Sequence, residues 1–205
     1  MRFRLLTWTQ VVLILGFSLM FIGCPKDDNP PPSEDLDPVT LVRMGWSSFE
    51  ALDYIEAYGF FEEAVRKDSN FPDAFSGAGW TAYEMADLEA AREHWEAGLV
   101  IDAANFDIRA GMGFLEYESG NYSESVVMFS GLLVDNYNYR FTHLSGLDYF
   151  DIHVTLAMDY YMQDLMAESL LEVQFLNPIF DTDVNTSEGV DELIVEIERL
   201  NSVYR

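Results

Sequence analysis

The stretch AGWTAYE, residues 78–84, recurs in matching form as MGWSSFE at 44–50 and as MGFLEYE at 112–118. Each copy has a glycine followed by an aromatic residue, then a second aromatic residue three positions later and a glutamate directly after it. The same register continues through further columns: Tyr54, Leu88 and Tyr122; Ala57, Ala91 and Ser125; Phe61, Trp95 and Phe129. Chance is a poor explanation for this alignment, so we predict three consecutive units with a period of about 34 residues.

Within each unit, apolar residues recur every three to four positions, which is typical of amphipathic helices. The pattern resembles the tetratricopeptide repeat, a helix-turn-helix unit of about 34 residues. The resemblance implies an all-α fold, a right-handed α-solenoid, with repeats at about 38–71, 72–105 and 106–139. In such repeats the small residues let paired helices approach closely: Gly45, Gly79 and Gly113 between the helices of a unit, and Ala57, Ala91 and Ser125 opposite the aromatic knobs Phe61, Trp95 and Phe129.

The regular spacing ends after residue 139. Residues 138–147 show no helical period and predict a longer loop. An irregular fourth repeat is predicted at about 148–180, where Asn177-Pro178 closes its second helix. Residues 188–204 place their apolar side chains on one stripe and their charges on the other. This pattern predicts a C-terminal capping helix with a polar outer face.

The N-terminal segment carries a targeting signal. Arg2 and Arg4 precede an apolar stretch at 11–22, an arrangement typical of a secretory signal peptide. Phe21-Ile22-Gly23-Cys24 resembles the lipobox of bacterial lipoproteins, which implies that Cys24 is lipidated and becomes the mature N-terminus. We therefore expect a signal peptide at 1–23, a lipidated, proline- and acid-rich tether at 24–37, and a helical domain at 38–205. An ordinary signal peptide with an incidental cysteine is the alternative.

The lipobox resemblance implies a location in the bacterial cell envelope. We expect a lipid-anchored protein at the outer membrane that faces either the periplasm or the cell surface. Lys26-Asp27-Asp28 resembles the signal that exports Bacteroidota lipoproteins to the surface. A solvated tether explains the same three residues equally well.

The chain has 36 acidic against 11 basic residues and a formal net charge of −25. Such a surface repels phosphate backbones and anionic headgroups, so nucleic-acid binding and electrostatic membrane docking are disfavoured. Contact with a membrane is therefore expected only through the lipid anchor. A composition of 49% hydrophobic and 15% aromatic residues supports a packed core, whereas a disordered acidic chain would lack both.

The sequence contains no motif for catalysis. A nucleophile-base set, a metalloprotease motif and a glycine-rich phosphate loop are all absent, so we expect no enzyme activity, no catalytic residues and no cofactor. One acidic stretch is a candidate calcium loop. It has oxygen ligands at four EF-hand-like positions, namely Asp181, Asp183, Asn185 and Glu192. Thr186 stands where that loop requires glycine, and an acidic loop before the last helix is the favoured alternative.

In the tetratricopeptide family the first helices of the repeats form a concave wall where partners bind. Carried over by column, that wall would include Trp46, Phe49, Glu50, Trp80, Tyr83, Glu84, Phe114, Tyr117 and Glu118. We expect the first aromatic column (Trp46, Trp80 and Phe114) to be exposed, whereas the second either lines the wall or packs between helices.

The chemistry of these columns suggests the class of partner. Aromatic anchors dominate interface hot spots and acids attract cations, so we expect a protein or peptide partner with apolar or aromatic anchors and basic residues. A glycan-binding or uptake accessory protein is the alternative, because aromatic platforms also stack on sugar rings.

Overall fold

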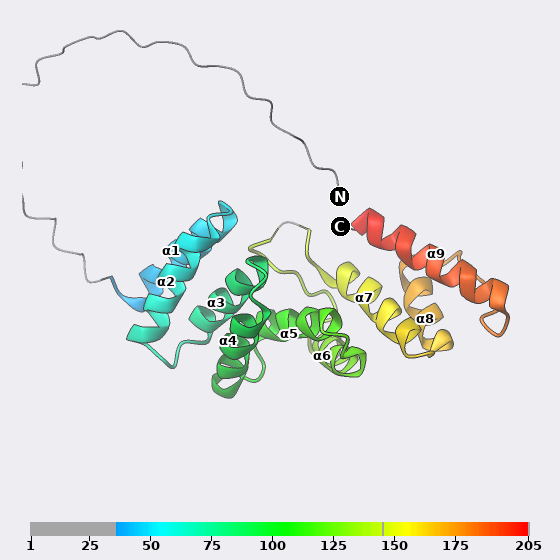
Figure 1. Ribbon diagram of the computed structural model, residues 1–205, viewed down its shortest axis with the longest axis horizontal. Coiled ribbons are helices and arrows are strands. Elements are labelled where there is room, and N and C mark those ends of the chain that lie inside the picture. Colours follow the sequence, from blue (N-terminus) through cyan, green and yellow to red (C-terminus); the bar gives the residue numbers. More distant parts are fainter. Residues whose placement is uncertain (1–35, 145, 205) are drawn as a thin grey trace, which may run out of the picture. The chain divides into compact units, whose positions relative to one another are not determined.

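The computed structural model describes residues 36–144 and 146–204, and every extended element of regular structure in this part of the chain is a helix (Figure 1). Consecutive helices form antiparallel pairs: α1 (Pro38–Glu50) with α2 (Tyr54–Lys67), α3 (Pro72–Glu84) with α4 (Leu88–Ile101), α5 (Phe106–Glu118) with α6 (Tyr122–Asp135), and α7 (Tyr149–Met162) with α8 (Met166–Leu176). The final helix is α9 (Ser187–Tyr204). The prediction of an all-α chain of helical repeats is confirmed.

The expected signal peptide, Cys24 and the Lys26-Asp27-Asp28 segment lie outside the described residues. Within the described ranges, none of the helices combines the length and the apolar character that crossing a bilayer would need.

The helix starts follow from local sequence. Asp37 precedes Pro38, and its carboxylate accepts a hydrogen bond of 3.0 Å from the backbone N–H of Thr40, as a helix cap does. Proline suits the first helical position because the N–H that it lacks would have no partner there. Pro72 begins α3 in the same way, although the preceding Phe71 contributes no side-chain cap.

The turn inside each helix pair uses one residue with positive φ. These residues are Leu52, Ala86, Gly120 and Asp164, with φ values of 63°, 60°, 77° and 59°. The left-handed conformation costs residues with a Cβ about 1–2 kcal/mol, and only the third repeat has the glycine that avoids this cost. The turn geometry is therefore repeated in all four pairs, although the glycine that favours it occurs once.

Large aromatic side chains fill the space between neighbouring repeats. The buried ring of Phe61 in α2 lies against Gly45 of α1 and Gly77 of α3, where a Cβ on Gly77 would come within 2.1 Å of the ring. Trp95 has the equivalent place one repeat later, 2.3 Å from the position of a Cβ on Gly79. The small residues therefore create the room for the aromatic knobs. Gly45 and Gly79 belong to the predicted glycine column, whereas Gly77 was not singled out by the sequence.

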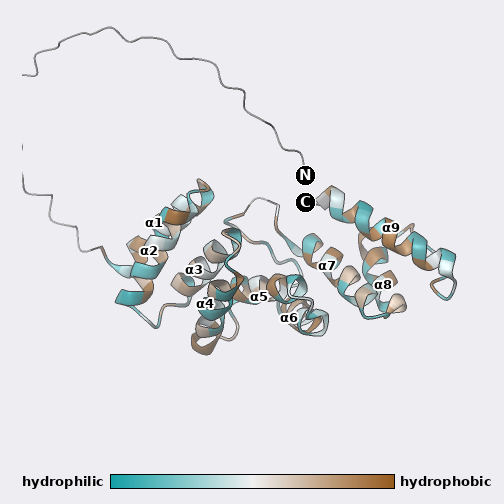
Figure 2. Ribbon diagram, viewed as in Figure 1, coloured by the Kyte–Doolittle hydropathy of each residue, from teal (hydrophilic) through white to brown (hydrophobic). Residues whose placement is uncertain are grey.

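The fourth pair and α9 form a second core. Leu193, Ile197 and Leu200 of α9 pack with Val154 of α7 and Val173 of α8. Along α9, hydrophobic and hydrophilic residues alternate around the helix, so one side faces this core and the other faces solvent (Figure 2). The helix thereby covers the apolar surface that the last repeat would otherwise expose.

Candidate functional site

The first helices of the four pairs form one continuous surface. Helix α1 contacts α3, α3 contacts α5, and α5 contacts α7. We call this surface the A-helix face. All nine residues that the sequence assigned to a binding wall belong to α1, α3 or α5.

The first aromatic column is not exposed. Trp46 and Phe114 are each 6% exposed, and Trp80 is 0% exposed. The expectation of an open aromatic platform is therefore wrong. Stacking of sugar rings needs exposed ring faces, so the glycan-binding alternative has no platform in this column.

The segment that joins α6 to α7 covers Trp46 and Trp80 of this column. This folded-back loop (residues 136–144 and 146–148) runs across the A-helix face instead of connecting the two helices directly (Figure 1). Its Phe141 ring stacks on Trp80 with the centroids 4.4 Å apart, and its His143 ring stacks on Trp46 at 3.8 Å. The loop thus covers the part of the face where a tetratricopeptide groove would receive a ligand.

Hydrogen bonds hold the loop in a hairpin-like conformation. The backbone N–H of Phe141 donates to the carbonyl of Leu147 at 3.0 Å, and the N–H of Tyr149 donates to the carbonyl of Tyr139 at 2.9 Å. Arg140 and Asp148 form an antiparallel bridge between the two sides of the loop.

Two polar contacts tie the loop to the helices beneath it. The hydroxyl of Tyr139 donates to Asp107 Oδ1 at 2.8 Å, and Nδ1 of His143 lies 2.8 Å from Glu50 Oε1. Burial raises the pKa of Asp107, and the hydrogen bond from Tyr139 opposes that rise. Burial, followed by the nearby Asp107 charge, also raises the pKa of Tyr139. The loop is thus anchored both by buried rings and by polar groups.

The second aromatic column links successive repeats. Phe49 is buried, whereas the half-buried Tyr83 donates its hydroxyl to Glu118 Oε1 at 2.6 Å. Tyr54 of α2, which belongs to a different column, donates its hydroxyl to Glu84 Oε2 at 3.3 Å. Glu84 and Glu118 therefore each accept a hydrogen bond from a tyrosine of the preceding repeat, whereas Glu50 contacts His143 of the loop.

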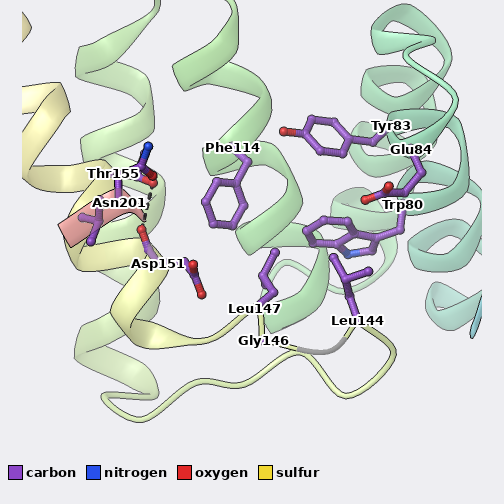
Figure 3. A pocket seen from close by; sticks show the side chains of 11 residues that line it. Trp80, Tyr83, Glu84, Phe114, Leu144, Gly146, Leu147, Asp151, Thr155 and Asn201 are labelled. Atoms are coloured by element: carbon purple, nitrogen blue, oxygen red, sulfur yellow. Dashed lines mark hydrogen bonds between the residues drawn. The ribbon is translucent and has the colours of Figure 1, made fainter. Parts of the chain in front are cut away.

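A cavity of about 270 Å³ remains open beside the loop, and we call it the groove cavity (Figure 3). Helices α3, α5, α7 and α9 and the folded-back loop all contribute to its walls. The lining residues are Trp80, Tyr83, Glu84, Phe114, Leu144, Gly146, Leu147, Asp151, Val154, Thr155 and Asn201. The structure thus brings together four of the nine predicted wall residues: Trp80, Tyr83, Glu84 and Phe114.

The remaining predicted wall residues are placed elsewhere, since Trp46, Phe49, Glu50, Tyr117 and Glu118 do not line the groove cavity. The far wall of the cavity was not predictable from the repeat columns. Asp151 and Thr155 come from the irregular repeat and Asn201 from α9, so no column of the repeat alignment could have assigned them.

The groove cavity is acidic. Its lining includes the carboxyl groups of Glu84 and Asp151, and it includes no lysine, arginine or histidine among the described residues. Burial raises the pKa of Glu84; the hydrogen bond from Tyr54 opposes this rise, and the negative charge of Glu118 adds to it. A cation placed near Glu84 would relieve this unfavourable environment.

One buried carboxyl was not singled out by the sequence. Asp159 of α7 is fully buried, and the hydroxyl of Ser125 donates to its Oδ2 at 2.6 Å. Its Oδ1 has no hydrogen-bond partner among the described residues. Burial raises the pKa of Asp159 to about 7, against the opposing effect of the Ser125 bond. The residue lies between two repeats, away from the groove cavity lining.

The acidic stretch before α9 does not have the conformation of an EF-hand-like loop. Helix α9 begins at Ser187, so the second half of the stretch is helical and Glu192 lies in the second turn. Glu192 accepts a hydrogen bond from Thr182, and Asp183 accepts two from Asn185. Across the described ranges, no three acidic, histidine or cysteine side chains are placed to hold a metal ion together. Calcium binding was the less favoured interpretation of this stretch, and an acidic loop before the last helix remains the favoured one.

Comparison with known proteins shows what this arrangement is similar to. No profile of a known protein family and no curated protein matches the chain significantly. A solved structure of MamA AMB-1 matches with a TM-score of 0.60 at 15% identity, covering 80% of this chain and 97% of that chain. PilF of Pseudomonas aeruginosa matches with a TM-score of 0.59 at 13% identity, covering 82% and 74%. The TPR domain of Arabidopsis OM64 matches with a TM-score of 0.51 at 15% identity, covering 60% and 93%.

At these low identities the matches establish a shared fold. The chain therefore folds as a helical repeat solenoid of the tetratricopeptide type.

Proposed function

We propose that the protein is a non-enzymatic lipoprotein of the bacterial cell envelope that binds a segment of a partner protein on its A-helix face. The observation that carries this proposal is the groove cavity, which lies on the face that tetratricopeptide folds offer to partners. The folded-back loop covers Trp46 and Trp80 on that face, so the partner segment is expected to bind at the groove cavity, between the loop and helices α3, α5, α7 and α9. The absence of a nucleophile-base set from the sequence motivates the non-enzymatic part of the proposal.

Photo-crosslinking in the native host tests the location of the partner. A photoreactive phenylalanine analogue at Asn201, which lines the groove cavity, is expected to crosslink one protein reproducibly. The matched control is the same analogue at Val100, which is 88% exposed on α4, a helix that does not line the groove cavity. Equal crosslinking of the same protein from Val100 would show that the A-helix face is not the binding surface.

The lipid anchor is the second part of the proposal, and it rests on the lipobox-like Phe21-Ile22-Gly23-Cys24. Cys24→Ser removes the thiol that would be acylated. We expect this variant to leave the membrane fraction while circular dichroism shows unchanged helix content. Labelled palmitate incorporated equally into the variant and the parent protein would rule out acylation at Cys24.

A further inference from the structure

The groove cavity has the dimensions of a site for one side chain. Its volume of about 270 Å³ falls just below the range of roughly 300–1,000 Å³ that is typical of pockets for drug-sized ligands. Leu144 and Leu147 of the loop form part of an apolar floor, and the ring of Phe114 stands beside them (Figure 3). A long side chain with an apolar stem would contact these surfaces along its length.

The charged groups of the cavity stand on opposite sides of it. Glu84 comes from α3 on one side, and Asp151 comes from α7 on the other (Figure 3). Asp151 Oδ2 also accepts a hydrogen bond of 2.8 Å from the backbone N–H of Asp148, which fixes its orientation. Because the described lining contains acidic but no basic side chains, a ligand with a positive charge complements it.

An aromatic ring lies next to the carboxylate on the α3 side. Tyr83 precedes Glu84 and is half-buried, and its hydroxyl is held by Glu118. Aromatic faces attract cations, and arginine or lysine near such a face is a common arrangement. Trp80 also borders the cavity, but it is fully covered and therefore supports the wall without offering surface to a ligand.

We propose that the groove cavity binds a lysine or arginine side chain of the partner segment, with its methylene groups on Leu144, Leu147 and Phe114 and its cationic head between Glu84 and Asp151. This inference rests on the proposed function and names the chemistry that the partner must present. The partner segment is thus basic at the position that enters the cavity. The formal net charge of −25 on the chain favours approach of such a segment over an acidic one.

The test compares three probes by nuclear magnetic resonance on the full chain in detergent, labelled at the leucine methyl groups. The probes are acetyl-Gly-Lys-Gly-amide, the same peptide with norleucine in place of lysine, and n-pentylammonium. We expect the lysine peptide to shift the methyl signals of Leu144 and Leu147 in a saturable way. The norleucine peptide has the same stem without the charge and is expected to bind at least tenfold more weakly.

Two variants show whether the negative charge within the cavity causes the preference for the lysine peptide. Glu84→Gln keeps an acceptor for the Tyr54 hydroxyl. It is expected to lower the affinity for the lysine peptide at least fivefold and to leave the affinity for the norleucine peptide unchanged. Asp151→Asn keeps the bond from Asp148 and gives an independent test if the first variant unfolds. Glu89→Gln, on the exposed side of α4, is the matched control and is expected to leave the affinity for all three probes unchanged.

Each other outcome overturns the inference. Equal affinity for the lysine and norleucine peptides would make the cavity an apolar anchor site and leave the proposed function intact. If Glu89→Gln weakened binding of the lysine peptide as much as Glu84→Gln does, the effect would come from the overall charge of the protein and not from the cavity. Tighter binding of n-pentylammonium than of the peptide would assign the cavity to free amines, and unmoved leucine signals would show that no cationic side chain enters it. The proposed function fails separately, through the crosslinking result.

Discussion

Replacing Trp80 with alanine is expected to lower the free energy of unfolding by about 3–5 kcal/mol, the typical cost of removing a large buried ring. The indole ring is fully buried and packs edge-to-face against Trp95 at 5.3 Å. Its N–H donates to the backbone carbonyl of Asp107 at 3.0 Å, so the substitution also removes a hydrogen bond between α3 and α5. In a repeat array such a loss weakens the neighbouring repeats as well.

Urea denaturation followed by circular dichroism measures this effect. Trp95→Ala, which removes a knob between repeats, is expected to cost a similar amount, because Trp95 is equally buried. The control Val100→Ala truncates an exposed side chain of α4 and is expected to stay within about 0.5 kcal/mol of the parent protein. A loss for Trp80→Ala as small as that of the control would place this ring in solvent, as the sequence had suggested.

The second large effect is a dependence of stability on pH that comes from Asp159. Its pKa of about 7 in the folded protein lies above the ordinary value of 3.8. Between these two values the unfolded chain has released a proton that the folded chain still holds, so stability falls as the pH rises. The contribution of the protonated Asp159 side chain to the free energy of unfolding is fully present below about pH 4 and lost above about pH 7. At about 1.36 kcal/mol for each pKa unit, this rise in pKa corresponds to about 4 kcal/mol in the free energy of unfolding.

Asp159→Asn replaces the titrating group with a neutral one that can still accept the bond from Ser125. The variant is expected to become more stable relative to the parent protein as the pH increases. The difference between their free energies of unfolding should change by about 4 kcal/mol between about pH 4 and pH 8. Chemical denaturation at both pH values measures this change, and comparing variant with parent cancels the titration of Glu84 and Asp107. The control Asp191→Asn alters an exposed carboxyl of α9. A pH-independent difference for Asp159→Asn would contradict a raised pKa.

The helices were predictable because their signals are local. The glycine and aromatic columns repeat with a fixed period, and the aromatic knobs pack against their own and the next repeat, as Phe61 does with Gly45 and Gly77. Such a pattern therefore contains most of the packing information for α1 to α6. The same reasoning holds for α9, whose apolar stripe needs only one adjacent surface.

The state of the A-helix face was not predictable by the same means. His143 lies 93 positions from Glu50 in the sequence, and the loop that carries it has no period. Nothing in the columns distinguishes a tryptophan that faces solvent from one that is covered by a distant loop. Asp159 was missed for a related reason, because an aspartate within a helix shows its burial only once the neighbouring repeat is in place.

The packing of the folded-back loop on the A-helix face is tested most directly by a double-mutant cycle on Trp80→Ala and Phe141→Ala. Phe141 is 2% exposed and stacks on Trp80 at 4.4 Å. We predict that Phe141→Ala alone costs about 3–5 kcal/mol and that the two substitutions together cost about 1 kcal/mol less than the sum of their separate effects, the coupling that an aromatic pair in contact shows. Additive effects, with a loss below about 0.5 kcal/mol for Phe141→Ala, would mean that the loop does not cover this face and that the first aromatic column is open to a partner.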